Sequence, residues 1–135
     1  MHITSKDQTT DPLHNPTGEV VYELIGGSEK TGGTKRHSLA HIVIPPGASS
    51  HSHYHKVSEE SYYILKGQAR IKIDTKDFSL GPGQTCLIEP KERHIISNEG
   101  LEDLEFLAVS APPWTPDDSF QESSTEEDPY QSEAT

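Results

Sequence analysis

The segment Gly47–Gly67 reads GASSHSHYHKVSEESYYILKG and places three alternating histidines ahead of two adjacent glutamates and an apolar run. Alternate residues of an extended strand share one face, so His53 and His55 project to the same side, and His51 has the same parity. The two glutamates are neighbours and face opposite sides, so only one of them can join the histidines. Taken alone, the segment is compatible with a metal site and with a solvated polar loop.

The rest of the chain consists of short strand-like runs separated by glycine and proline turns. Within residues 70–74, Ile71 and Ile73 alternate with charged residues, as one half-buried strand requires. No window has apolar residues at helical spacing. The candidate strands lie within residues 18–27, 35–47, 60–74, 78–90, 93–98 and 103–114. This spacing predicts an all-β fold, an antiparallel sandwich or barrel, with a jelly roll as the natural candidate.

The two ends of the chain differ from its middle in composition. We assign residues 1–17 to a flexible N-terminal arm, 18–114 to a β-barrel domain, and 115–135 to an acidic tail that is disordered or loosely draped. The tail has seven acidic residues and no Lys or Arg, so it supplies −7 of the net charge of −11. The remaining 15 acidic and 11 basic residues leave a mildly acidic body. Neither nucleic acid nor an anionic membrane is therefore expected as a partner.

Cysteine usage and hydropathy bear on the compartment. With Cys86 as its one cysteine, the chain cannot form an internal disulfide, and we expect this side chain to be a small buried hydrophobe. No stretch approaches the roughly 20 apolar residues of a membrane helix. The N-terminus shows no basic region followed by an apolar core. A cytoplasmic protein without a membrane span is the expectation.

A further histidine, His94, follows a proline-containing turn and begins a short apolar strand. In a closed barrel it could reach the same interior point as His53 and His55. Two neutral imidazoles and a carboxylate suit divalent Mn, Fe, Co, Ni or Zn, and a third imidazole would leave two open positions on an octahedral ion. One carboxylate against a divalent ion also tolerates an anionic ligand that completes the shell.

Two motifs of this sequence resemble the signature motifs of the cupin superfamily. The first matches Gly47, His53, His55, Glu60 and Gly67 at every spacing, so it selects the second of the two adjacent glutamates. The apolar run after that glutamate is also typical of the family.

The second motif matches at Gly83, His94 and Asn98. It departs at two positions, because Pro90 stands one place late and Lys91 stands where glycine is usual. We interpret this departure as a reshaped turn that still delivers the histidine. The resemblance covers about residues 36–110.

The resemblance implies a small double-stranded β-helix, a jelly-roll barrel. It also implies that a divalent transition metal (Mn, Fe, Ni, Co or Zn) is held by His53, His55, Glu60 and His94. The implied function is a metal-dependent enzyme acting on a small polar or anionic molecule, of the dioxygenase, isomerase or epimerase, or lyase type. A non-catalytic sugar- or carboxylate-binding cupin and a purely structural cupin are the alternatives.

Several side chains outside the motifs have two interpretations. Tyr62 shares the parity of Glu60, so it either points inward as a catalytic acid or base, or packs the barrel with its hydroxyl at the rim. His51 is expected to be a solvated turn residue. His41 either faces the pocket or is a histidine tolerated on a strand.

The end of the last long strand suggests a partner. Residues 104–109 are apolar on both faces, which predicts that both faces are covered and favours a homodimer. Three prolines surround Trp114, so the chain should leave the barrel there and lay this side chain on the barrel surface or on a partner subunit.

Overall fold

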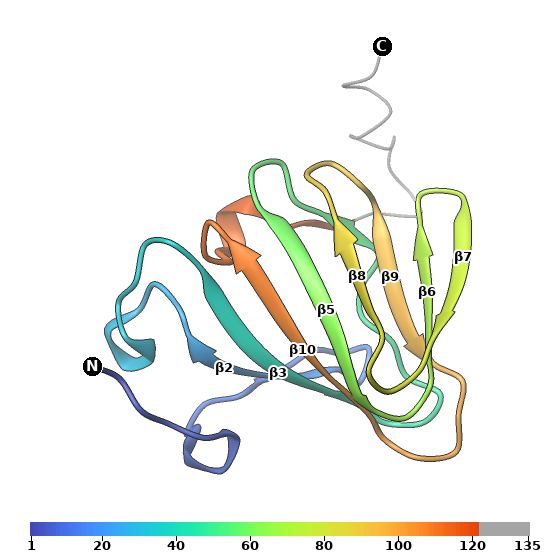
Figure 1. The fold of residues 1–135 in the computed structure, drawn as a ribbon, viewed down its shortest axis with the longest axis horizontal. Coiled ribbons are helices and arrows are strands. Elements are labelled where there is room, and N and C mark those ends of the chain that lie inside the picture. The colour runs from blue at the N-terminus through green and yellow to red at the C-terminus, as the bar shows by residue number, and fades with distance from the viewer. Residues whose placement is uncertain (122–135) are drawn as a thin grey trace.

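The strands form two antiparallel sheets that face each other (Figure 1). A computed structural model describes residues 1–121 of the chain. The six-stranded sheet has the order β1-β2-β3-β10-β5-β8 and comprises β1 (Leu13–His14), β2 (Val20–Ile25), β3 (Ser38–Ile44), β5 (Glu59–Lys66), β8 (Thr85–Ile88) and β10 (Leu104–Ala111). The five-stranded sheet has the order β11-β4-β9-β6-β7 and comprises β4 (His53–Tyr54), β6 (Ala69–Ile73), β7 (Lys76–Leu80), β9 (His94–Asn98) and β11 (Phe120–Gln121).

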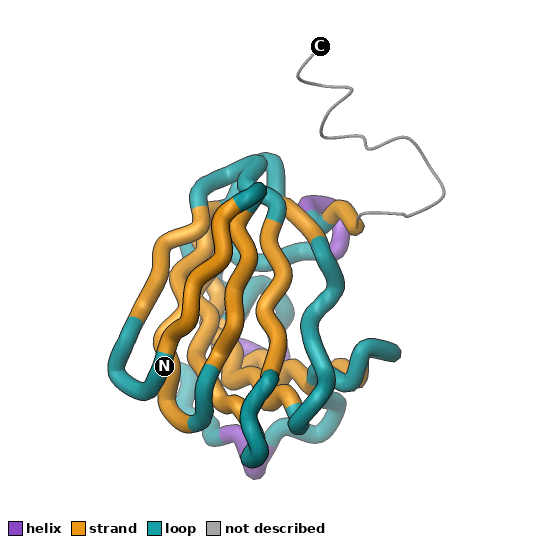
Figure 2. Tube along the Cα trace, turned by 90° about the vertical axis from the view of Figure 1, so that its right-hand side faces the viewer, coloured by secondary structure: helices purple, strands orange, loops and turns teal. Residues whose placement is uncertain are grey.

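The chain passes back and forth between the sheets as it proceeds. From β3 onward, β3, β5, β8 and β10 belong to one sheet, and β4, β6, β7 and β9 belong to the other. Figure 2 shows the strands of the five-stranded sheet running side by side, with helix confined to single turns at the periphery. This alternation makes the molecule a jelly roll and confirms the predicted all-β fold.

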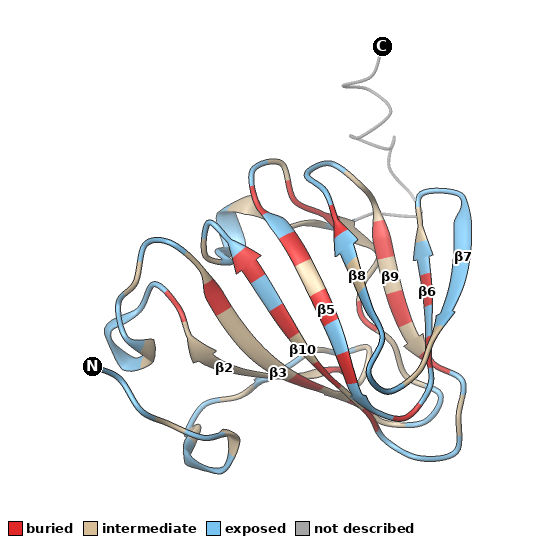
Figure 3. Cartoon of the chain, viewed as in Figure 1, coloured by how far each residue is buried: buried red, intermediate tan, exposed pale blue. Residues whose placement is uncertain are grey.

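The core lies between the sheets and follows the two-residue period of the strands. Along β5 and β10, buried residues alternate with half-buried or exposed ones (Figure 3). Ile71 is buried and its neighbours Arg70 and Lys72 are exposed, as the sequence pattern predicts. The side chains that fill the space between the sheets include Ile42, Ile44, Ile64, Ile71, Ile88, Ile96, Leu104 and Phe106.

Tight turns fall where the sequence places glycine. Gly47, Gly67 and Gly83 all have positive φ angles, of 81°, 85° and 85°. At Gly67 a Cβ atom would also approach the carbonyl oxygen of Asp103 to 2.8 Å. A side chain at this position would therefore be strained by the backbone and would clash with β10's entry turn.

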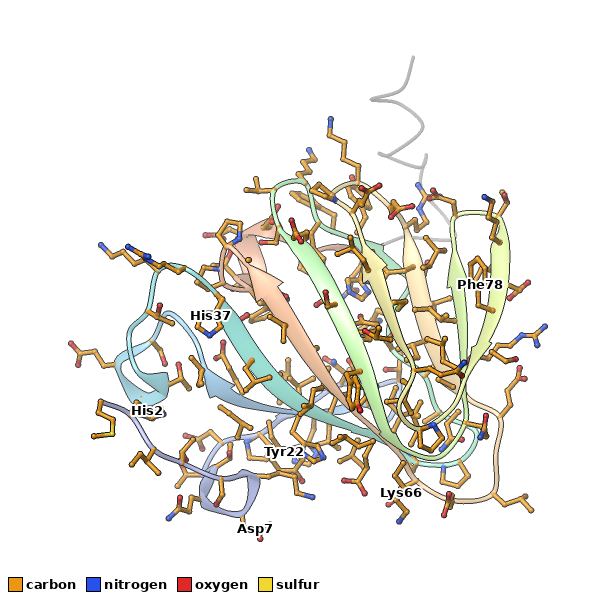
Figure 4. All side chains as sticks on the ribbon, in the orientation of Figure 1. His2, Asp7, Tyr22, His37, Lys66 and Phe78 are labelled. Atoms are coloured by element: carbon orange, nitrogen blue, oxygen red, sulfur yellow. The ribbon has the colours of Figure 1, made fainter. Side chains whose placement is uncertain are left out.

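The two ends of the described chain lie against the barrel. The N-terminal segment includes the turn η1 (Lys6–Gln8) and the strand β1, which pairs with β2. In Figure 4 the labelled His2 and Asp7 lie on the β2 side of the molecule, and Phe78 lies at the opposite edge, on β7.

The C-terminal end contributes its own short elements. Beyond β10 the chain forms η3 (Pro116–Asp118) and the strand β11, which pairs with β4. Residues 115–121, assigned to the tail from composition, thus lie beside β4, and residues 122–135 of that tail lie outside the described part. Together with η2 (Glu29–Thr31), these single turns are the helices of residues 1–121, and none has the length or apolar character needed to cross a membrane.

Candidate metal centre

Three histidines and one glutamate converge at one end of the barrel interior. Their ligand atoms all lie within 4.8 Å of one another, in the set His53, His55, Glu60 and His94. The register explains the meeting, because His53 on β4 lies directly opposite His94 on β9. Glu60 reaches the same point from β5 in the facing sheet. Glu60 is buried and its neighbour Glu59 is exposed, so the structure orients the glutamate pair as the motif spacing indicates.

The Nδ1 atom of each of these histidines is occupied by a backbone carbonyl. His53 Nδ1 lies 2.8 Å from the carbonyl oxygen of His51, and His94 Nδ1 lies 3.0 Å from that of Glu92. His55 Nδ1 lies 2.7 Å from the carbonyl oxygen of Asp118. A carbonyl can only accept, so each Nδ1 carries the proton and each Nε2 keeps a free lone pair in the neutral ring.

The Nε2 atoms then meet the carboxylate of Glu60. Oε1 of Glu60 lies 3.2 Å from His94 Nε2 and 3.7 Å from His55 Nε2. His55 Nε2 is buried and has no hydrogen-bond partner among the described residues. Such an orphaned acceptor is costly unless something binds it. Imidazole nitrogens and one carboxylate oxygen are the donors that a divalent transition metal takes, so these residues fit a metal ion.

The electrostatics of the cluster keep Glu60 ionised and the ring of His53 neutral. Burial, with the nearby His94, lowers the pKa of His53 to about 3, so its ring stays neutral. Burial alone would raise the pKa of Glu60, but the neighbouring His55 and His94 hold it well below its usual range. Burial also lowers the pKa of His55, and its contacts with Glu60 reverse that effect and raise it. An ionised carboxylate therefore attracts positive charge to the point where the imidazoles meet.

A cavity of about 390 Å³ opens from this cluster toward the N-terminal segment. Its inner wall includes His53, Glu60 and Tyr62, and its outer wall includes Thr9, Asp11, Lys30 and Trp114. Polar and apolar side chains both line the cavity, and Lys30 is the one Lys or Arg among its described lining residues. A small polar molecule could thus reach the cluster from one side.

Comparison with known proteins agrees with this geometry. Residues 40–110, more than half of the chain, match the family model of the cupin domain. The chain belongs to the cupin family. It is 38% identical over 114 residues to an oxalate-binding protein of Thermotoga maritima, and the match covers 81% of this cupin and 92% of that protein.

Solved structures give the same fold. A predicted oxalate decarboxylase from Thermotoga maritima is 30% identical, with a TM-score of 0.69 over 82% of this cupin and 98% of that chain. The polyketide cyclase RemF from Streptomyces resistomycificus has a TM-score of 0.74 over 100% of this cupin and 94% of that chain. At 20% identity, the second likeness shows the fold alone.

The turn before His94 shows how this cupin accommodates its departure from the second motif. Lys91, at the place of the usual glycine, has a φ of 73° and so keeps the left-handed conformation that glycine adopts freely. Its N–H donates to the carbonyl oxygen of His55 at 2.6 Å. The turn is therefore reshaped in sequence but still ties the loop before His94 to His55, which directly follows β4.

The other candidates divide between the cavity and the surface. Tyr62 points inward, is 3% exposed, and lies near His94 with ring centroids 6.1 Å apart. His51 also lines the cavity, although we expected a solvated turn residue. His41 lies on the other face of its sheet, where its Nε2 is 2.8 Å from Glu105 Oε1. Cys86 is partly buried against the core, and burial raises the pKa of its thiol to about 11.

Three polar residues near the cluster have no counterpart in the sequence-based prediction. Ser110 donates to Oε2 of Glu60 at 3.1 Å, and Asp118 positions His55 through its carbonyl. Glu19 is buried in the cavity wall. The sequence pattern could have indicated Ser110, because it shares the inward-facing parity of Phe106 and Ala108 on β10. Asp118 and Glu19 lie outside the motifs.

Proposed function

We propose that His53, His55, Glu60 and His94 bind a divalent transition metal (Mn, Fe, Co, Ni or Zn), and that this cupin is a metal-dependent enzyme acting on a small polar or anionic molecule. The observation that carries the proposal is the hydrogen bonding of the three imidazoles. Each has its Nδ1 proton held by a carbonyl and its Nε2 aimed at a common point, which is how metal-binding histidines are oriented. When bound, the ion would supply Lewis acidity to a ligand oxygen.

The protein supports that chemistry through the charges that it places around the centre. Glu60 offsets one of two metal charges, so the centre keeps a net positive charge that favours an anionic ligand. Lys30 is the one cation of the described cavity wall, and it lies at the mouth, 3.5 Å from Asp11. An anionic group would therefore be held at the centre itself. Together with the similarity to an oxalate-binding protein, this supports a small carboxylic acid as the ligand class.

Tyr62 is our candidate for a catalytic acid. Burial and the neighbouring carboxylates of Glu60 and Glu19 raise its pKa well above the usual value. Its hydroxyl group therefore keeps its proton at neutral pH and can serve as a donor, but not as a base. The competing interpretation is a packing role, since its ring lies 4.9 Å from that of Phe106.

The second candidate function is carboxylate binding without turnover. The similarity to a protein named for oxalate binding favours it. Incubation of the metal-loaded protein with oxalate separates the two candidates: conversion of oxalate supports an enzyme, and stoichiometric binding with the oxalate intact supports a binding protein.

Elemental analysis of untagged protein, purified without chelator, tests the metal centre. We expect one equivalent of metal in the parent and none in a His53→Ala, His55→Ala double variant. His51→Ala is the matched control, because it removes a nearby imidazole and keeps the backbone carbonyl that His53 contacts. Absence of metal from the parent, even after reconstitution, would overturn the proposal.

We also propose that the outer face of the six-stranded sheet pairs two copies of the chain. Exposed apolar side chains gather there on three adjacent strands, namely Tyr63 and Leu65 on β5, Leu87 on β8, and Val109 on β10. Light scattering should give twice the mass of 14.9 kDa, and Leu87→Glu should reduce it to the monomer value. A monomeric parent would exclude this arrangement.

A further inference from the structure

Glu19 is a buried carboxyl group in the wall of the same cavity. Its residue is 8% exposed, and it lies immediately before β2. The one hydrogen bond that its side chain makes among the described residues comes from Asn15, whose Nδ2 donates to Oε1 at 2.7 Å. The metal centre proposed above does not use this group.

The fold directs Glu19 toward the interior of the barrel. Glu19, Val21 and Glu23 alternate along the chain, and all three line the cavity. Gly18 forms a bridge with Ser49, which in turn bridges Ser97 on β9. Glu19 thus enters at the seam where the edge of one sheet meets the other, close to the strands that carry the histidines.

Lys and Arg side chains do not compensate this carboxyl group within the described cavity. The wall's one Lys or Arg is Lys30, at the mouth and beside Asp11. A buried carboxylate without a cation is costly to ionise. Burial, with a smaller contribution from the charge of Glu60, accordingly raises the pKa of Glu19 to about 7, although the Asn15 hydrogen bond acts in the opposite direction.

A purely structural role does not explain a carboxyl group here. The turn that leads into β2 is already closed by the backbone, since the N–H of Asn15 donates to the carbonyl oxygen of Glu19 at 2.9 Å. An amide side chain would accept the Asn15 hydrogen bond equally well and would carry no ionisation cost. What a glutamate adds is a proton that can be gained or lost inside the cavity.

We propose that Glu19 is a second ligand-binding residue of this pocket, and that its carboxyl group shares a proton with an anionic oxygen of a ligand held at the four-residue cluster. The inference rests on the proposed function, which places that ligand. Glu19 takes one proton from solvent as the anion binds, its new O–H bond donates to the ligand oxygen, and the proton returns to solvent on release. No oxidant or reductant is needed.

Other ionisable groups border the same space and define the controls. Those that share the cavity wall with Glu19 are Asp11, Glu23, Lys30, His51, His53, Glu60 and Tyr62, and His94 acts on it through its charge. Glu23 is the matched control. It lies four residues further along, on β2, lines the same cavity, and also has its pKa raised by burial.

The test is the affinity of the metal-loaded protein for oxalate, measured by calorimetry from pH 6.0 to 8.5. In the wild type and in Glu23→Gln, affinity should fall on the order of tenfold across this range as Glu19 loses its proton. In Glu19→Gln, whose amide donates a hydrogen bond at every pH, the change should stay within about threefold. Metal content is measured in parallel for each variant.

Two results would overturn the inference. If Glu19→Gln binds metal and oxalate with the same pH dependence as the wild type, another group carries the proton. If the metal-loaded wild type does not bind oxalate at pH 6.0, the proposed ligand class fails and the inference fails with it. If Glu19→Gln does not fold, Asn15→Ala replaces it. Removing the Asn15 hydrogen bond raises the pKa of Glu19 further, so the fall in affinity should move to higher pH. An unchanged pH profile would count against Glu19.

Discussion

The same strands build two opposite ends of this barrel. On β5, the inward side chains change from Glu60 and Tyr62 at one end to Ile64 at the other. On β9 they change from His94 to Ile96, and all five of these residues are buried to 6% exposure or less. One end is thus an apolar core and the other a buried polar site, although backbone pairing is continuous between them.

This difference separates the part of the barrel that stabilises the fold from the part that carries the candidate site. The apolar end removes hydrocarbon from water, which is the main favourable term in folding. The polar end buries imidazoles and carboxyl groups, which cost free energy unless they are paired. We therefore expect substitutions at the two ends to affect different measurements.

The largest effect on stability should come from the apolar end. Ile71→Ala should lower the free energy of unfolding by about 4 kcal/mol, since it leaves a cavity among fully buried side chains. Urea denaturation measures the loss, and the folded protein should still bind one equivalent of metal. The exposed neighbour provides the control, because Lys72→Ala should change stability by less than about 0.5 kcal/mol. Equal losses from both would contradict the division between core and surface.

At the polar end, removing a charge should stabilise the metal-free protein. Native Glu19, with a pKa of about 7 against 4.5 in a model peptide, holds its proton more tightly than the unfolded chain does. Its contribution to stability is therefore fully present below pH 4.5 and is lost as the pH rises through 7. Glu19→Gln should exceed the wild type by about 2–3 kcal/mol at pH 8 and match it at pH 4.5. If the difference in the free energy of unfolding between the two proteins does not depend on pH, ionisation of Glu19 is not its cause.

The two ends also differ in how far the sequence predicts them. Strand alternation is a local property, so Ile71 and Ile73 could be assigned to one face without knowledge of the fold. The candidate metal ligands were predicted from motif spacing, because no local pattern indicates that His94 lies opposite His53. Lys91 shows the limit of a motif: its residue type departs, yet its backbone keeps the conformation that the motif's glycine would adopt.

What the sequence did not reveal depends on contacts between distant segments. Glu19 and Asp118 lie outside both motifs, and only the folded barrel brings Glu19 into the cavity wall and Asp118 to His55. Composition was also misleading for Asp118, since it belongs to an acidic stretch whose charges look interchangeable. Pro116 and Asp117 begin a helical turn, but no pattern in the sequence predicts that this turn docks on the segment that follows β4.

The smallest effect should come from Asp118, which joins the polar end to the C-terminal segment. Its carboxylate accepts the N–H groups of Lys56, Val57 and Ser58 at 2.9 to 3.2 Å. Asp118→Ala removes these bonds but keeps the carbonyl that holds His55. We expect a loss of about 1–2 kcal/mol in the free energy of unfolding at pH 7. Metal affinity, measured by competition with a chelator, should fall by up to about tenfold because His55 is less firmly held.

The pH dependence of that loss identifies its cause. Burial is the largest single influence and raises the pKa of Asp118, but the three N–H groups together outweigh it and lower the pKa below 3.8. Its contribution is therefore present above the unfolded pKa and disappears as the pH falls through the folded one, so variant and wild type should converge in acid. Asp117→Ala is the matched control, since it removes the neighbouring charge and none of these hydrogen bonds. If it cost as much as Asp118→Ala, the acidic segment would act through its net charge, and the polar end would not depend on one docked carboxylate.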